Sequence, residues 1–341
     1  MAGKIIAKLT RFLKIGGGSA APGLYALKIY PELVSDLTQD IPQSVVITGT
    51  NGKTTTARML AHFAQAQGLK VLRNATGSNL ERGIASTLLS HSHLPGGKLT
   101  NVDLAIWELD EAAFNQLVPK LKPKIIVFLN VFRDQLDRYG EVDTIVKKWS
   151  ETLKNTPKDT LLLVNGDDQN LLNLKKAFKG KFFTFGVENY KISGENINKK
   201  VGKEKLDLEA KNLVLVGLSG THFELVEYDG LWTFSLPLPG IYHIYDFLAA
   251  FAIGSQLGLE PKQMITSLKD FSPAFGRMEK LGFGYIFLIK NPAGATQVFE
   301  TISPQIKTQD RLLLALNDNL ADGTDVSWIW DAEFEKLRTT N

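Results

Sequence analysis

Residues 44–60 decide how this sequence folds, and they read Ser44-Val45-Val46-Ile47-Thr48-Gly49-Thr50-Asn51-Gly52-Lys53-Thr54-Thr55-Thr56-Ala57-Arg58-Met59-Leu60. A β-branched apolar run breaks at Gly49, and after Thr55 the apolar pattern resumes as a helical one, with Met59, Leu60 and Phe63 at helical spacing. The pattern predicts a strand, a loop and a helix. Backbone N–H groups of such a loop can converge on phosphate oxygens, and the N-terminus of the helix adds a favourable dipole. The stretch therefore predicts a phosphate site.

The loop also carries the side chains that a nucleoside triphosphate requires. Lys53 can reach the transferred phosphates, and the Thr54 hydroxyl can hold Mg²⁺. The general pattern has a glycine five residues before Gly52, where Ile47 stands, so the loop is a shorter variant. The alternative is a glycine-rich turn that binds nothing, but the order of Gly, Gly, Lys and Thr after a strand favours phosphate binding. The predicted nucleotide-binding residues of the loop are Gly49, Thr50, Asn51, Gly52, Lys53, Thr54 and Thr55.

Length and composition are typical of a globular protein. The 341 residues allow about two or three domains, and 44% hydrophobic with 22% charged residues is an ordinary balance. A net charge of +3 gives no argument for nucleic acid. No run approaches the roughly 18 apolar residues that span a bilayer, so we expect a cytoplasmic protein without a transmembrane segment. The basic N-terminal face, Lys4, Lys8, Arg11 and Lys14, is either a solvated helix face or a contact with the inner membrane surface.

The sequence contains no cysteine. Disulfides, thiolate zinc sites and a cysteine nucleophile are therefore excluded within this chain.

The hydrophobic pattern predicts an α/β fold with a doubly wound, mostly parallel sheet, because strands alternate with helices after residue 44. We expect an N-terminal helical segment at 1–43, a central nucleotide-binding domain at 44–270 and a partial Rossmann-like C-terminal domain at 271–341. A small antiparallel lobe is predicted at about 182–236. The expected strands are 45–48, 70–74, 104–108, 125–130 and 161–165, followed in the last domain by 285–290 and 311–317, with helices at 242–257 and 297–302.

Several polar residues follow predicted strands on the side of the phosphate loop. Glu108 ends a buried strand and is placed to hold Mg²⁺. Asn130 and Asp134 follow the next strand and can orient a nucleotide, metal or acceptor, whereas Arg133, Asp137 and Arg138 could equally form surface ion pairs. Arg277 stands in an interdomain linker, from which an arginine can swing onto a nucleotide when domains close.

Together these residues resemble the Mur ligase superfamily, whose phosphate loop matches Gly49–Thr55 and whose magnesium-binding glutamate matches Glu108. Within the superfamily the chain is similar to the MurT family, the ligase subunits of lipid II isoglutaminyl synthase. The stretches that carry this narrower resemblance are 16–24, 76–80, 108–114, 133–141, 290–294 and 318–331.

Three departures from the family pattern are visible. MurT proteins commonly carry a four-cysteine zinc ribbon, whereas Tyr190–Lys211 holds no cysteine, so we expect no zinc. His243 and Asp246 stand where the family usually has asparagines. The chain also ends about ninety residues earlier than a typical Mur ligase, which implies an incomplete C-terminal domain.

The resemblance implies ATP-dependent amidation of the D-glutamate α-carboxylate of lipid II to D-isoglutamine through an acyl phosphate, with Mg²⁺ bound. Ammonia would come from a GatD-like glutaminase partner, because the chain has no thiol for glutamine hydrolysis. The family also carries a C-terminal aspartate that completes the partner's cysteine–histidine pair. Among Asp318, Asp322, Asp325 and Asp331 we favour Asp325 and then Asp331, so the predicted catalytic residues are Lys53, Asp325 and Asp331.

Two other functions remain open at this point. One is a stand-alone amino-acid ligase of the Mur or folylpolyglutamate type. The other is a non-catalytic nucleotide-binding subunit that positions a partner.

Overall fold

The structure is a computed structural model of the chain. It describes residues 20–74, 78–92, 99, 101–132, 142–188, 205–227, 230–272, 277–307, 309–318 and 326–337.

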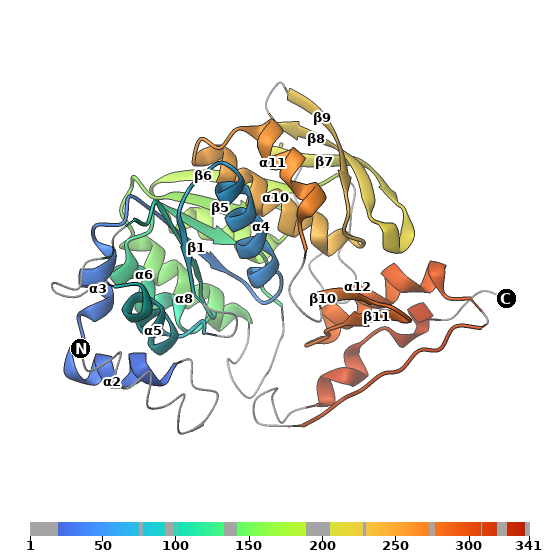
Figure 1. Cartoon of the computed structure of the whole chain (residues 1–341), viewed down its shortest axis with the longest axis horizontal. Helices are drawn as coiled ribbons and strands as arrows, with labels where there is room; N and C mark the ends of the chain where they lie inside the picture. Colours follow the sequence, from blue (N-terminus) through green and yellow to red (C-terminus); the bar gives the residue numbers. More distant parts are fainter. Residues whose placement is uncertain are drawn as a thin grey trace.

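A nine-stranded sheet runs through the middle of the molecule (Figure 1). Its strands lie in the order β2-β3-β1-β4-β5-β6-β7-β8-β9. All pairs from β2 to β7 are parallel, and β7, β8 and β9 pair antiparallel at one edge. The phosphate loop follows β1, which lies between β3 and β4. The strands are β1 (Gln43–Thr48), β2 (Val71–Arg73), β3 (Leu104–Glu108), β4 (Ile125–Phe128), β5 (Leu161–Asn165), β6 (Lys181–Val187), β7 (Leu208–Leu215), β8 (Thr221–Glu227) and β9 (Gly230–Leu236).

The antiparallel part of the sheet is smaller than the sequence predicts. Strand β6 was expected in the antiparallel lobe, but it pairs parallel with both β5 and β7, for example Phe183 beside Leu163. Its burial is nearly continuous from Phe183 to Val187, as is usual for a strand covered on both faces. Strand β7, in contrast, alternates between buried and partly exposed residues at its start. Antiparallel pairing therefore begins at residue 208 rather than at about 182.

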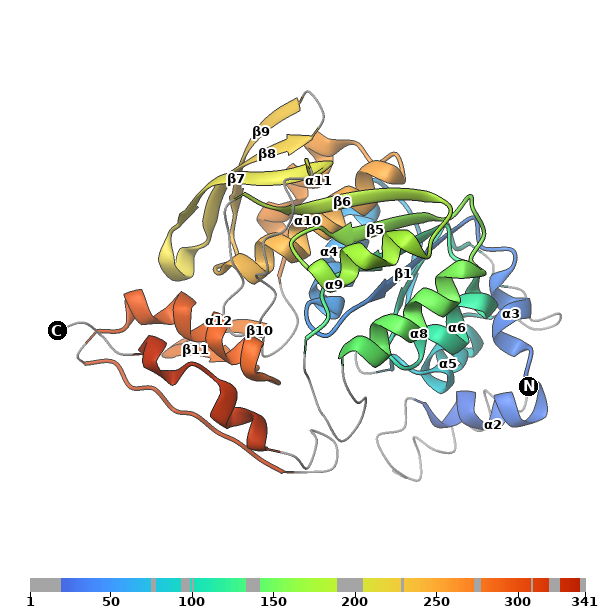
Figure 2. The same ribbon diagram turned by 180° about the vertical axis from the view of Figure 1, so that it is seen from behind.

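Helices cover both faces of the sheet (Figures 1 and 2). On one face lie α4 (Lys53–Ala66), α10 (Ile241–Gln256) and α11 (Pro261–Ser267), which share one hydrophobic core with the strands. The opposite face packs a second core against the other helices. These are α3 (Leu33–Thr38), α5 (Glu81–His91), α6 (Phe114–Leu121), α8 (Val142–Lys154) and α9 (Gln169–Leu172), with α2 (Ala21–Ile29) lying outside them against α5.

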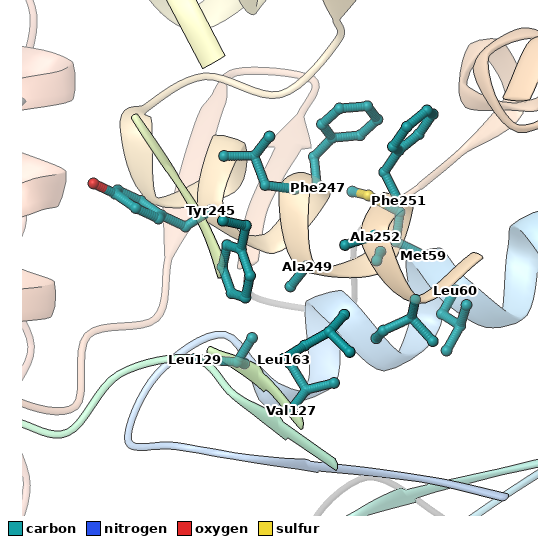
Figure 3. Close-up of a cluster of buried hydrophobic side chains, with 14 of the residues drawn as sticks. Met59, Leu60, Val127, Leu129, Leu163, Tyr245, Phe247, Ala249, Phe251 and Ala252 are labelled. Atoms are coloured by element: carbon teal, nitrogen blue, oxygen red, sulfur yellow. The ribbon is translucent and has the colours of Figure 1, made fainter. Parts of the chain in front are cut away.

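Helix α10 is buried along most of its length, which fits its largely apolar sequence. Its Ala249 lies on the side of the strand residues Val127, Leu129 and Leu163, whereas the rings of Phe247 and Phe251 point away from those residues (Figure 3). Phe247 also contacts the rings of Phe63, Phe223 and Phe234 edge to face. Helix α10 therefore fixes α4, and with it the loop that precedes α4, relative to the sheet.

The C-terminal segment differs from the predicted β–α–β start. Strands β10 (Arg277–Leu281) and β11 (Gly284–Phe287) form an antiparallel pair, and α12 (Pro292–Ile302) follows. Residues 311–317, predicted as a strand, belong to neither sheet. Their leucines suggested a buried strand, but no layer covers them in the described part of the chain, and Leu313 is 88% exposed. A small core of Ala295, Phe299 and Ala332 instead joins α12 to the 3-10 turns η5 (Ser327–Asp331) and η6 (Phe334–Leu337).

Within the described residues, no helix is long and apolar enough to cross a membrane.

Candidate active site

The backbone of the phosphate loop needs glycine at two positions. Gly49 has φ +138° and Gly52 has φ +87°, a region that L-residues with a side chain rarely adopt. A Cβ at Gly49 would lie 2.9 Å from the carbonyl oxygen of Asn130, and one at Gly52 would lie 2.1 Å from Asp246 Oδ1. Gly52 is the N-cap residue of α4, so the loop leads directly into the helix N-terminus. This geometry suits an anion beside the first turn of α4.

Asn130 braces the loop from the end of β4. Its Oδ1 accepts a hydrogen bond from the backbone N–H of Asn51 (2.8 Å), and its Nδ2 donates to the Asn51 carbonyl (3.1 Å). Its own carbonyl accepts from the Thr50 N–H (3.2 Å). The Thr50 hydroxyl exchanges hydrogen bonds with the backbone of Phe132 (3.0 and 3.3 Å). Both ends of the Asn130 amide therefore bond to the loop backbone.

The residues on both sides of Asn130 are held by the turn after β5. Asn165 Nδ2 donates to the Leu129 carbonyl (2.9 Å), and Asp168 Oδ2 accepts from the Val131 N–H (2.9 Å). Asp168 Oδ1 accepts from the Asn170 N–H (3.0 Å) and so caps α9. Burial raises the pKa of Asp168 to about 6, although these hydrogen bonds favour its charged form. The neighbouring Asp167 accepts from Tyr245 Oη (2.6 Å) and the Val187 N–H (2.8 Å), and burial likewise raises its pKa to about 6.

Thr54 and Glu108, the two residues predicted from the sequence to hold Mg²⁺, meet at the start of α4. Thr54 Oγ1 donates to Glu108 Oε2 (2.6 Å), and both side chains are buried. Asn74 holds the Glu108 backbone through its Oδ1 (2.9 Å) and its Nδ2 (3.0 Å). A hydroxyl and a carboxylate oxygen beside a phosphate loop are ligands that Mg²⁺ accepts, usually completed by phosphate oxygens and water. These two side chains therefore fit Mg²⁺.

Two residues that sequence reasoning missed complete the charge distribution. Arg73, the last residue of β2, places Nη1 3.1 Å from Glu108 Oε1. Glu111 lies in the turn after β3, and its buried carboxylate is 3.4 Å from Lys53 Nζ. Lys53 also donates to the carbonyls of Gly49 and Thr50, so its ammonium group lies against the loop. Arg73 could have been found by noting that β2 and β3 end at the same edge of a parallel sheet.

The N-terminal part of α10 touches the loop through Asp246. The Thr56 hydroxyl donates to Asp246 Oδ1 (3.4 Å), the same oxygen that lies beside Gly52. The His243 ring is buried, and its Nδ1 donates to the Pro239 carbonyl (2.7 Å), which can only accept. Burial and the Asp246 charge raise the pKa of Tyr242 above its ordinary range.

An asparagine from the C-terminal segment also reaches the loop. Asn51 Nδ2 donates to Asn291 Oδ1 (3.2 Å), and Asn291 Nδ2 donates to Asn51 Oδ1 (3.0 Å). The loop, the central sheet and the C-terminal segment therefore meet at Asn51.

Family models of known proteins match both the part of the chain that carries the phosphate loop and its C-terminal part. Residues 47–254 match the family model of the Mur ligase middle domain, and residues 288–341 match that of the MurT ligase C-terminal domain. The MurT subunit of lipid II isoglutaminyl synthase (glutamine-hydrolyzing) from Streptococcus pneumoniae is 32% identical over 356 residues, covering 95% of this chain and 78% of that protein.

The chain belongs to the MurT family of Mur ligases.

A MurT subunit from Staphylococcus aureus is 28% identical, with 94% of this chain and 77% of that protein covered. Among solved structures, MurF from Acinetobacter baumannii superposes with a TM-score of 0.67 at 20% identity, covering 83% of this chain and 58% of that one. Folylpolyglutamate synthase from Mycobacterium tuberculosis, solved with ADP, gives 0.60 at 15% identity, covering 81% and 69%. At these identities the likeness shows the shared Mur ligase fold.

Several residues predicted for this MurT-family site are not placed. Asp134, Asp322 and Asp325 lie outside the described residues, as does most of the segment where the family's zinc ribbon was expected. Arg277 begins β10, but its side chain is not described, so its predicted nucleotide contact stays a prediction.

Two other predicted residues are placed by the structure. Asp331 is exposed at the end of η5. Thr55 is buried in the first turn of α4. Within the described ranges, no group of three or more His, Asp or Glu side chains could hold a metal by itself.

Proposed function

We propose that this chain is the ATP-dependent ligase subunit of a lipid II isoglutaminyl synthase. It would convert the D-glutamate α-carboxylate of lipid II to the amide of D-isoglutamine during peptidoglycan synthesis. The observation that carries the proposal is the buried Thr54–Glu108 pair at the start of α4, beside a phosphate loop, in a chain 32% identical to a MurT subunit. The names of the MurT relatives supply the reaction and the need for a second subunit.

The chemistry requires activation of a carboxylate, which is a poor electrophile. A carboxylate oxygen attacks the γ-phosphorus of ATP, the bond to the bridging oxygen breaks, and ADP leaves. The nitrogen of ammonia then attacks the carbonyl carbon of the acyl phosphate, loses a proton, and phosphate departs with the former carboxylate oxygen. Both steps call for neutralisation of negative charge rather than for a covalent nucleophile on the enzyme.

The chain's own residues meet that need. Lys53 and the N-terminus of α4 would stabilise charge on the transferring phosphoryl group, since Lys53 Nζ already lies against the loop carbonyls. Thr54 and Glu108 would hold Mg²⁺, which neutralises phosphate charge when bound. Ammonia would come from a GatD-like glutaminase, because the chain lacks the cysteine on which glutamine hydrolysis commonly depends.

The test uses the purified chain with ATP, Mg²⁺, lipid II and an ammonium salt, and mass spectrometry of the lipid. Amide formation without a glutaminase supports the proposal, and glutamine should replace ammonium only when the partner subunit is present. A product that forms only with an added amino acid would instead identify a stand-alone ligase. Nucleotide binding without any product would identify a non-catalytic subunit. Lys53→Ala is the matched control for contaminating activity.

A further inference from the structure

The phosphate loop is joined to two different parts of the molecule by asparagine amides. Asn130 bonds to the backbone of Asn51, and Asn291 bonds to its side chain. Asn130 follows β4 of the central sheet, whereas Asn291 lies 240 residues further along the chain than Asn51, in the C-terminal segment. The Asn51 side chain is therefore the point at which the loop and the C-terminal segment contact each other through two reciprocal hydrogen bonds.

Asn291 is held in place from its own side as well. It is 0% exposed, and its Oδ1 accepts from the Gly294 N–H (2.8 Å), which makes it the N-cap of α12. Pro292 occupies the first helical position, which favours helix initiation at this point. Helix α12 in turn packs against η6 and the 3-10 turn η2 (Gly217–Ser219). Loss of the Asn51 side chain would therefore remove two hydrogen bonds from the residue that caps α12.

We propose that Asn291 is a positioning residue that couples the described C-terminal residues, 277–307, 309–318 and 326–337, to the nucleotide bound at the phosphate loop. The inference rests on the proposed ATP-binding role of that loop. Through the Asn51 side chain, the arrangement of the loop favoured by nucleotide also fixes the N-terminus of α12. By thermodynamic linkage, the docked C-terminal segment favours nucleotide binding to the same degree.

The residue type fits this role. A primary amide is both donor and acceptor, so Asn291 Nδ2 can donate to Asn51 while Oδ1 accepts from Asn51 and from Gly294. Serine would keep the helix cap but is too short to reach Asn51. The pair is uncharged, so it can lie near phosphates without repelling them, and the positive end of α12 faces the same loop.

The experiment is a double-mutant cycle on the full chain with a non-hydrolysable ATP analogue and Mg²⁺. The variants are Asn51→Ala, Asn291→Ser and the double variant, and Asn51→Ala breaks the pair without touching the α12 cap. Glu260→Ala is the matched control, because the Glu260 carboxylate caps α11 by accepting from the Lys262 and Gln263 N–H groups and so tests the loss of a helix cap away from the loop. Calorimetry measures affinity, and hydrogen exchange measures protection of α12 with and without the analogue.

We expect each single variant to bind the analogue on the order of tenfold more weakly, and the double variant to bind no more weakly than either. The analogue should slow exchange in α12 of the parent chain and of Glu260→Ala, but not in the two Asn variants. Additive effects on affinity, or an α12 response that survives in Asn51→Ala, would overturn the coupling. Failure of the parent chain to bind the analogue would overturn the proposed function instead.

Discussion

Arg73 Nη1 lies 3.1 Å from Glu108 Oε1, while the other oxygen of the same carboxylate accepts a hydrogen bond from Thr54. The guanidinium thus neutralises the carboxylate that would ligate Mg²⁺. Because the arginine already offsets the negative charge of the carboxylate, the attraction between Glu108 and Mg²⁺ is weaker than it would be without the arginine. We therefore expect Arg73 and Mg²⁺ to compete for Glu108.

We expect Arg73→Ala to lower the Mg²⁺ concentration required for half-maximal nucleotide binding. A partly exposed charge pair of this kind is worth about 1 kcal/mol, which corresponds to a shift of roughly fivefold. The measurement is a Mg²⁺ titration at fixed nucleotide, with Arg73→Lys as the control that keeps the charge. An unchanged or higher Mg²⁺ requirement in Arg73→Ala would show that the arginine assists the metal rather than competing with it.

Lys53→Ala is expected to abolish amidation with either glutamine or ammonia. The loop would lose the charge that stabilises the transferring phosphoryl group, a loss of several kcal/mol, or about a hundredfold or more in rate. The check is the amidation rate under saturating ATP, with thermal unfolding to confirm that the variant is folded. Near-normal turnover would remove Lys53 from the proposed mechanism.

Asp167 and Asp168 predict how stability depends on pH. Burial raises the pKa of each to about 6 in the folded chain from 3.8. The folded state therefore holds these protons more tightly than the unfolded state between about pH 4 and pH 6. Their contribution to stability is fully present below pH 3.8 and is lost as pH rises through about 6.

Asp167→Asn should flatten this dependence without lowering the melting temperature at pH 8. One amide oxygen can still accept from Tyr245 and Val187, which both bond to Oδ2 in the parent chain. Asp168→Asn is the contrasting variant. It should lower the melting temperature, because Asp168 accepts backbone hydrogen bonds on both oxygens and an amide has only one acceptor. Melting curves from pH 5 to pH 8 test both expectations. A melting temperature that depends more steeply on pH in Asp167→Asn than in the parent chain would contradict the first, and an unchanged melting temperature in Asp168→Asn would contradict the second.

Asp325 is the residue we expect to serve the glutaminase partner. In the complex, Asp325→Asn should lose glutamine-dependent amidation and retain the ammonia-dependent reaction, because only the orientation of the partner's histidine would change. Parallel assays with the two nitrogen sources separate these effects. If both rates fall together, Asp325 belongs to the ligase site or the fold. If neither falls, the role passes to Asp331, which is exposed at the end of η5.

The sequence predicts the parts of the fold that depend on local patterns. The strand–loop–helix around Gly49–Thr55 and the strand ending at Glu108 are read from periodicity and residue type, and the structure contains both. The Thr54–Glu108 contact follows because β1 and β3 are parallel neighbours whose carboxyl ends meet.

The parts that the sequence did not predict depend on distant partners. Arg73 is informative only once β2 is known to flank β3, and Asn291 only once α12 is known to reach the loop. The leucines of 312–316 have the pattern of a strand, yet a strand needs a neighbour, and the described chain provides none for them.

The register of β3 on β1, which places Glu108 beside Ile47, has a practical consequence. A slip of one residue would turn the Glu108 side chain to the opposite face of the sheet, since side chains alternate along a strand. Such a chain could be compact and still lack the carboxylate that we propose as a ligand of Mg²⁺. Magnesium-dependent thermal protection by nucleotide would therefore report the fraction of a preparation that has folded in the correct register, which compactness or helix content alone would not reveal.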